Sequence, residues 1–127
     1  RRSYSVIDHK RRSILVDGHP FFPVGWFSEY LSYGEPATIQ SLYDMARDGV
    51  NSIMLYNLIG GQHGQRFGRG KAPESPEQIL DTAASLGMKL QVYIYDITGK
   101  LSAGQTNDWD YLEEVVRRWR DHPAVLG

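Results

Sequence analysis

The sequence predicts an α/β fold built on a parallel sheet, and three features of the chain lead to this prediction. Short apolar runs, typical of buried strands, alternate with longer segments whose apolar residues recur at helical spacing. Residues that start and end helices bound these longer segments. An antiparallel hairpin precedes the alternation. Strictly alternating strands and helices imply parallel strands joined by right-handed crossovers.

Residues 1–20 form the predicted lead-in, a β-hairpin. Asp17-Gly18 is a strong turn dipeptide and stands between two apolar runs. Pro20 and Pro23 place this ribbon at an edge, because proline cannot donate a hydrogen bond to a ladder. The hairpin is therefore expected to lead into the core rather than to lie within it.

The first strand–helix unit begins with a core strand over residues 24–27, and an amphipathic helix follows. Pro36 suits the first turn of that helix, and Gly49 suits the position just after its end. The expected buried face of the helix consists of Ile39, Leu42, Tyr43 and Ala46. Residues 50–57 then form an almost wholly apolar run, as expected of a strand buried on both faces.

The second unit has the clearer helix signals. Ser75, Pro76 and Gln78 provide an N-cap, a proline at the first helical position and a residue able to complete a capping box. The expected apolar face consists of Ile79, Leu80, Ala83, Ala84 and Leu86. Gly87 ends this helix, and residues 88–96 form the next predicted strand, with Tyr93 and Tyr95 on the face opposite its aliphatic side chains.

A third helix is predicted from about residue 108 to residue 121. Its expected buried stripe consists of Trp109, Leu112, Val115, Val116 and Trp119. Pro123 ends the helix, because the residue before a proline is pushed away from the α region. Residues 124–126 are expected to begin a fourth parallel strand.

Two α/β architectures fit this order of elements: an open doubly wound sheet, or part of a (β/α)8 barrel, which needs about 250 residues. The chain holds three complete core strands and the start of a fourth within its 127 residues. A complete doubly wound domain would carry more strands, so the partial barrel is favoured. Residues 1–127 are then one domain, with the lead-in followed by three βα units and the start of strand four over residues 21–127.

Composition excludes several classes of function. Hydrophobic and charged residues make up 41% and 23% of the chain, the formal net charge is −1 and cysteine is absent. No global positive charge attracts nucleic acid, and no apolar run approaches the length needed to cross a bilayer. The glycine-rich stretch before Lys71 fails the P-loop pattern, because Ala72 stands where a hydroxyl residue is required. The four histidines are scattered, so we expect no metal and no cofactor.

Ligands in both candidate folds bind beyond the C-terminal ends of the parallel strands. An aromatic residue and a short polar or acidic residue stand at each predicted strand end. The candidate substrate-binding residues are Trp26, Glu29, Tyr56, Asn57, Tyr95 and Asp96. Aromatic faces stack on sugar rings, and carboxylates accept hydrogen bonds from hydroxyl groups. Equally, the aromatic residues could pack at the rim, and Asn57 and Asp96 could be turn formers that bond their own backbone.

Four segments together resemble successive strand regions of TIM-barrel glycoside hydrolases, the broad group of β-galactosidase-, cellulase- and mannanase-like enzymes. These segments are ILVDGHPFFPVGWF, MARDGVNSIMLYN, AASLGMKLQVYIYD and VRRWRDHPAVLG. The resemblance implies activity on O-glycosidic bonds with two catalytic carboxylates, and a carbohydrate as partner. It also implies a general acid/base at the end of the fourth strand and a nucleophile on the seventh, both beyond Gly127. No residue of this chain is then catalytic, and the remaining half of the barrel is expected in the parent chain. Relatives of this kind favour a secreted or periplasmic location.

Other interpretations stay open. Glu29 and Asp96 would face one mouth and could themselves form a carboxylate pair. The chain could also be a non-catalytic carbohydrate-binding or structural module. A doubly wound domain that binds a small molecule is the third alternative.

Overall fold

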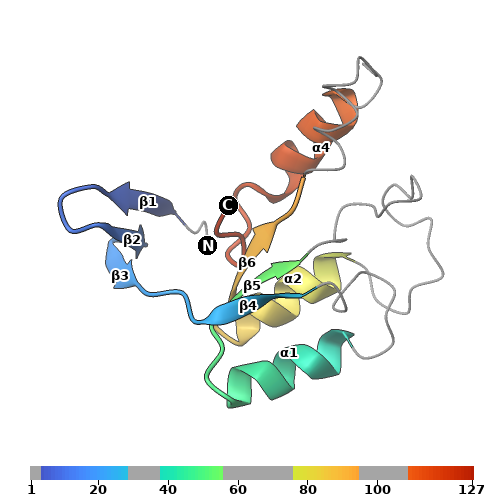
Figure 1. Ribbon diagram of the computed structural model, residues 1–127. Coiled ribbons are helices and arrows are strands. Elements are labelled where there is room, and N and C mark those ends of the chain that lie inside the picture. The colour runs from blue at the N-terminus through green and yellow to red at the C-terminus, as the bar shows by residue number, and fades with distance from the viewer. Residues whose placement is uncertain (1–3, 29–37, 56–75, 95–108) are drawn as a thin grey trace.

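The computed structural model describes residues 4–28, 38–55, 76–94 and 109–127. Within these residues the strands form two sheets of three strands each (Figure 1). The first sheet is antiparallel and comes from the N-terminal lead-in. The second is parallel and alternates with helices along the chain. This is the α/β arrangement predicted from the sequence.

The antiparallel sheet consists of β1 (Ser5–Asp8), β2 (Ser13–Val16) and β3 (His19–Phe21) in that order. The predicted hairpin around Asp17-Gly18 is confirmed as the β2–β3 pair, and both turn residues have positive φ, 52° and 81°. Two consecutive positive φ values twist the turn in the sense that matches the strands. The lead-in is nevertheless larger than predicted, because β1 adds a third strand along β2.

The parallel sheet consists of β4 (Gly25–Ser28), β5 (Ser52–Leu55) and β6 (Lys89–Val92). Its strands lie side by side in the same order as in the sequence. A parallel bridge between Leu90 and Val125 extends the pairing beyond β6. Residues 124–126 therefore run parallel to β6 at this bridge, whereas their membership of a fourth strand stays a prediction.

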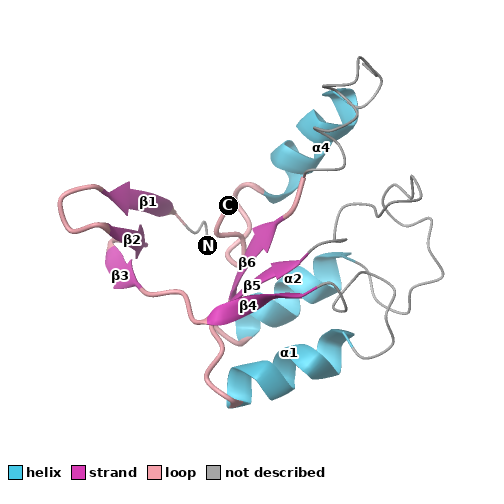
Figure 2. Cartoon of the chain, in the orientation of Figure 1, coloured by secondary structure: helices cyan, strands magenta, loops and turns pink. Residues whose placement is uncertain are grey.

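In the described residues, three helices accompany this sheet: α1 (Thr38–Arg47), α2 (Pro76–Ser85) and α4 (Trp109–Trp119), drawn in cyan in Figure 2. Pro76 is the first helical residue of α2, as predicted. Gly49 and Gly87 follow α1 and α2 with φ of 89° and 71°, the left-handed conformation in which helices commonly end at glycine. The terminating residues read from the sequence thus match the observed helix ends.

One core cluster joins the helices to the buried side of the parallel strands. Its members include Leu42, Ile53, Ile79, Leu80, Met88 and Leu90, whose side chains are almost fully buried. Glu77 ties α4 to α2, because it accepts a hydrogen bond from Trp119 Nε1 (3.3 Å) and pairs with Arg118 (2.7 Å). Buried side chains of all three described helices therefore belong to one apolar cluster.

Parts of the predicted buried stripes were wrong. Tyr43, Trp109 and Val116 are 48%, 58% and 48% exposed, whereas Met45 and Tyr111 are buried in their place. On α4 the buried residues are Tyr111, Val115 and Trp119, each four positions from the next. Residues spaced by four lie in one row along a helix, so the row that meets the core is narrower and rotated relative to the prediction.

Candidate functional site

The C-terminal ends of the three parallel strands lie level with one another. Ser28 pairs with Leu55, and Leu55 pairs with Val92, so each strand ends at the same point of the ladder. In α/β folds with parallel strands, ligands bind beyond this edge. The edge is therefore the candidate site, and the next residues along the chain are Glu29, Tyr56 and Tyr93.

Most of the predicted site residues lie outside the described part of the chain. These are Glu29, Tyr56, Asn57, Tyr95 and Asp96. Trp26 is the second residue of β4 and pairs with Ile53, two positions before the strand ends. The prediction that these six residues contact a sugar therefore stays a prediction.

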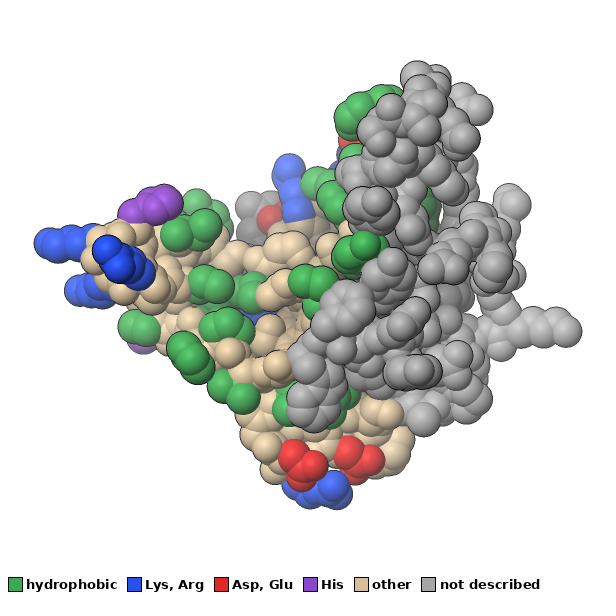
Figure 3. Space-filling view, in the orientation of Figure 1, with side chains coloured by type: hydrophobic (Ala, Val, Ile, Leu, Met, Phe, Trp, Pro, Cys, Tyr) green, Lys and Arg blue, Asp and Glu red, His purple; other side chains and the backbone are tan. Residues whose placement is uncertain are grey.

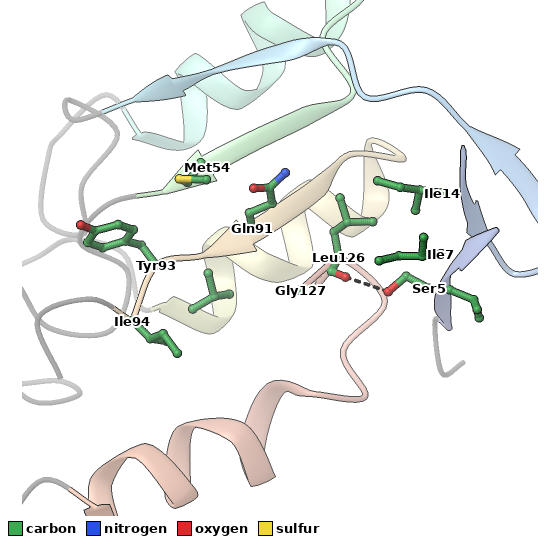
Figure 4. Close-up of a pocket in the computed structure, with 11 residues that line it drawn as sticks. Ser5, Ile7, Ile14, Met54, Gln91, Tyr93, Ile94, Leu126 and Gly127 are labelled. Atoms are coloured by element: carbon green, nitrogen blue, oxygen red, sulfur yellow. Dashed lines mark hydrogen bonds between the residues drawn. The ribbon is translucent and has the colours of Figure 1, made fainter. Parts of the chain in front are cut away.

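Tyr93 is a residue that the sequence interpretation did not include in the site. It follows Val92 directly, and Val92 is the last residue of β6 and pairs with Leu55, the last residue of β5. Its side chain lines a cavity together with Met54 and Gln91 (Figure 4). The signal was present in the sequence, since Gln91 and Tyr93 alternate with the aliphatic residues of this strand.

The cavity has a volume of about 750 Å³ and lies between the antiparallel sheet and the face of the parallel sheet opposite the helices. Val6, Ile7 and Ile14 line it from the antiparallel sheet. Further apolar surface comes from Val92 at the end of β6, from Ile94 just after it and from Leu126. Figure 3 shows hydrophobic side chains gathered in this central region. The cavity is thus bounded by two separate sheets and is mainly apolar.

Few polar groups face this cavity. Among its described lining residues, Gln91, Tyr93 and Ser5 carry polar side chains, and none is a carboxylate. The Ser5 hydroxyl donates to the Leu126 carbonyl oxygen at 2.7 Å. The described part of the cavity therefore offers an apolar wall with a phenol and an amide, and no carboxyl group.

Lys89 lies at the opposite end of β6, where the parallel strands begin. Its ammonium donates to the Pro123 carbonyl oxygen at 2.5 Å. Burial lowers the pKa of Lys89 below its ordinary value, and the negative charge of Asp17 partly offsets this effect. This end of the sheet therefore holds a partly buried cation with a structural contact to the start of the fourth strand.

The described residues contain no group of three or more His, Asp or Glu side chains placed to hold a metal ion. Over the same part of the chain, the helices are too short or too polar to cross a bilayer.

Comparison with known proteins finds a likeness in fold. No protein-family model and no curated protein sequence matches the chain. A solved structure of a glycoside hydrolase family 5 protein from Bacteroides vulgatus ATCC 8482 is similar, with a TM-score of 0.64 and 16% sequence identity. The match covers 95% of this chain and 31% of that one, so the chain spans about a third of that protein's length. At this identity the likeness shows a shared fold.

Proposed function

We propose that this chain forms the first βα units of a (β/α)8 barrel of the glycoside hydrolase type, in a protein that hydrolyses O-glycosidic bonds. The observation that carries the proposal is the fold likeness to a family 5 glycoside hydrolase along nearly the whole chain. The motifs from ILVDGHPFFPVGWF to VRRWRDHPAVLG point to the same group of enzymes. In this proposal residues 1–20 are the lead-in, and residues 21–127 hold three units and the start of the fourth strand.

The topology supports a barrel over an open doubly wound sheet. Doubly wound sheets reverse their strand order and carry helices on both faces. Here the strands follow one another in chain order, and the three described helices share one core. Met54 and Gln91 line the cavity on the other face. A face of this kind, apolar and turned away from the helices, suits the interior of a barrel.

The proposed contribution of the chain to catalysis is substrate binding at three strand ends. Trp26, Glu29, Tyr56, Asn57, Tyr95 and Asp96 are the proposed sugar contacts. We add Tyr93 because it directly follows Val92, the residue at which β6 stops pairing with β5. The acid/base and nucleophile carboxylates would come from the later strands of the parent protein, which would also close the barrel around the apolar face.

A binding experiment tests this role directly. The chain is titrated with a panel of β-linked oligosaccharides, and binding is followed by saturation-transfer NMR of the sugar protons. Glu29→Gln and Asp96→Asn should each weaken binding about tenfold or more, as expected when a hydrogen bond to a charged group is lost. Asp110→Asn is the matched control, because Asp110 is an exposed carboxylate near the start of α4. Equal binding by all three variants would rule out the proposed contacts.

A hydrolysis assay distinguishes the proposed function from two alternatives, a catalytic pair within this chain and a non-catalytic carbohydrate-binding module. A longer polypeptide that continues past Gly127 should cleave aryl glycosides, whereas the 127-residue chain should be inactive, because hydrolysis needs both carboxyls. Cleavage by the 127-residue chain that is abolished by Glu29→Gln would instead assign the catalytic pair to Glu29 and Asp96. A longer polypeptide that binds sugar without cleaving it would favour a non-catalytic carbohydrate-binding module.

The state of the chain in solution separates the barrel from the doubly wound alternative. An incomplete barrel leaves strand edges open, and open edges pair with other chains. Size-exclusion chromatography should therefore show self-association of the 127-residue chain. A stable monomer that unfolds cooperatively would favour a doubly wound domain that binds a small molecule.

A further inference from the structure

Residues 124–127, the proposed start of the fourth strand, are held to β6 by a parallel bridge and three backbone hydrogen bonds. Leu90 N–H donates to the Ala124 carbonyl oxygen (2.6 Å), and Leu126 N–H donates to the Leu90 carbonyl oxygen (2.9 Å). Val92 N–H donates to the Gly127 carbonyl oxygen at 2.8 Å. A ladder of backbone bonds by itself repeats every two residues, so it fixes the pairing but leaves a two-residue slip open.

In addition to these backbone bonds, two side chains each donate a hydrogen bond to one carbonyl group of the same segment. Ser5 of β1 donates to the Leu126 carbonyl oxygen at 2.7 Å, as the dashed line in Figure 4 shows. Lys89 donates to the Pro123 carbonyl oxygen at 2.5 Å. Each bond is made to the carbonyl group of one particular residue. A shift of residues 123–126 along β6 would therefore break both bonds.

A third contact comes from α2 and runs through the imidazole of His122. Its Nε2 lies 3.1 Å from Asp81 Oδ1, and its Nδ1 accepts a hydrogen bond from Ala124 N–H at 3.2 Å. A ring nitrogen that accepts a hydrogen bond carries no proton, so the neutral ring carries its proton on Nε2. Asp81 Oδ1 accepts a hydrogen bond from this Nε2–H group, and the carboxylate thereby fixes the ring orientation that holds Ala124.

We propose that Ser5, Lys89 and the Asp81–His122 pair are positioning residues that set the register of the fourth parallel strand. They come from the antiparallel sheet, from β6 and from α2, so three elements converge on residues 122–126. The importance of this register for catalysis rests on the proposed function, in which the fourth strand carries the general acid/base. Displacement of reacting groups by about 1 Å can cost about a hundredfold in rate, so the register of this strand would matter for activity.

The unmodified chain provides the first test. In the uncharged form of the His122 ring, nitrogen-15 NMR should show the proton on Nε2 and none on Nδ1. A ring proton on Nδ1, or rapid exchange between the two tautomers, would overturn the role of the Asp81–His122 pair. His9, exposed in the turn between β1 and β2, is the internal reference and should show averaged tautomers.

Variants provide the second test, read as amide hydrogen exchange at Leu126 and Val92. Ser5→Ala and Asp81→Asn should each speed exchange at these amides about fivefold relative to amides of α1, the change expected from one net hydrogen bond. Ser13→Ala is the matched control for Ser5→Ala, because the Ser13 hydroxyl is buried in the same sheet without a hydrogen-bond partner. If Ser5→Ala and Ser13→Ala leave exchange at these amides equally unchanged, the antiparallel sheet does not set the register.

A graded series at residue 122 separates positioning from simple packing. His122→Asn keeps an acceptor for the amide two residues on, as in an Asx turn, whereas His122→Ala removes it. Exchange at Leu126 should be closer to that of the unmodified chain in His122→Asn than in His122→Ala. Equal exchange in the two variants would reduce His122 to a packing residue. None of these measurements involves a sugar, so failure of the register proposal and failure of the proposed function give different results.

Discussion

Gly25 provides the sharpest prediction about the parallel sheet. A Cβ built on Gly25 would lie 1.6 Å from the Ser52 carbonyl oxygen and 2.7 Å from its carbon, both backbone atoms of β5. Real Cβ contacts are essentially never shorter than 3.0 Å, so Gly25→Ala forces β4 away from β5. Overpacking of this kind costs about 1–3 kcal/mol. The shift also weakens or breaks the hydrogen bonds from Asn51 N–H and Ser52 N–H to the Val24 carbonyl oxygen, each of which contributes about 1 kcal/mol.

We therefore expect Gly25→Ala to lower the free energy of unfolding by about 2–5 kcal/mol. Urea denaturation followed by far-ultraviolet circular dichroism measures the change, and a loss of this size moves the midpoint by about 1 M or more. Gly18→Ala is the control, because nothing lies within 4 Å of its built Cβ and its cost comes from a φ of +81° alone. Such backbone strain costs about 1 kcal/mol. A Gly25→Ala variant as stable as Gly18→Ala would refute the close approach of β4 and β5.

Three further predictions follow from the core, the buried cation and the contact between helices. Leu90→Ala should destabilise the chain by about 3–5 kcal/mol in urea melts, because this side chain is fully buried, whereas Ile7→Ala, at an exposed position, should cost less than 1 kcal/mol. The lowered pKa of Lys89 means that the unfolded chain binds the extra proton more readily, so stability should rise as the pH increases from that lowered pKa to 10.5. This rise is measured as the difference in unfolding free energy between the unmodified chain and Lys89→Met, and an unchanged difference across that pH range would contradict the assignment. Glu77→Gln should cost less than 1 kcal/mol, because the ion pair is partly exposed and the amide oxygen can still accept from Trp119, while Glu77→Ala should also change the fluorescence of Trp119.

Features that depend on nearby residues could be predicted from the sequence. Pro76 begins α2 and Gly87 follows its end, because proline lacks a backbone donor and glycine tolerates positive φ. The Asp17-Gly18 turn follows from the same kind of local preference. These residues restrict their own backbone whatever surrounds them, so the sequence was sufficient to place them.

Features that depend on a distant partner could not be predicted as well. Strand β1 carries Val6 and Ile7, both largely exposed, so no alternation of buried and exposed residues marks it, and its pairing with β2 defines it. Trp109, which was expected to be buried, is exposed, and Tyr111 is buried instead, because the orientation of α4 is set by its contacts with the rest of the core. Helical spacing limits the possible faces of a helix, and packing chooses among them.

The candidate site also combines predictable and unpredictable features. Parallel pairing predicts that the strands end at one edge of the sheet. The sequence pattern, however, predicts a third strand that runs to residue 96, whereas β6 ends at Val92. For this reason the predicted site contains Tyr95 and Asp96 but not Tyr93. Strand length depends on where the neighbouring strand stops pairing, which a single stretch of sequence does not contain.

The hydrogen bond from Ser5 to Leu126 joins residues that are 121 positions apart. A ribosome adds about 5–20 residues per second, so Leu126 follows Ser5 by roughly 6–25 s. Hairpins form within microseconds, so the N-terminal sheet can fold long before residues 124–127, which it contacts through Ser5, have been synthesised. During that interval Ile7 and Ile14, which later line the cavity, face water or a chaperone. Synthesis rate therefore sets how long a nascent chain carries an open apolar face, and slow translation would lengthen its exposure to aggregation.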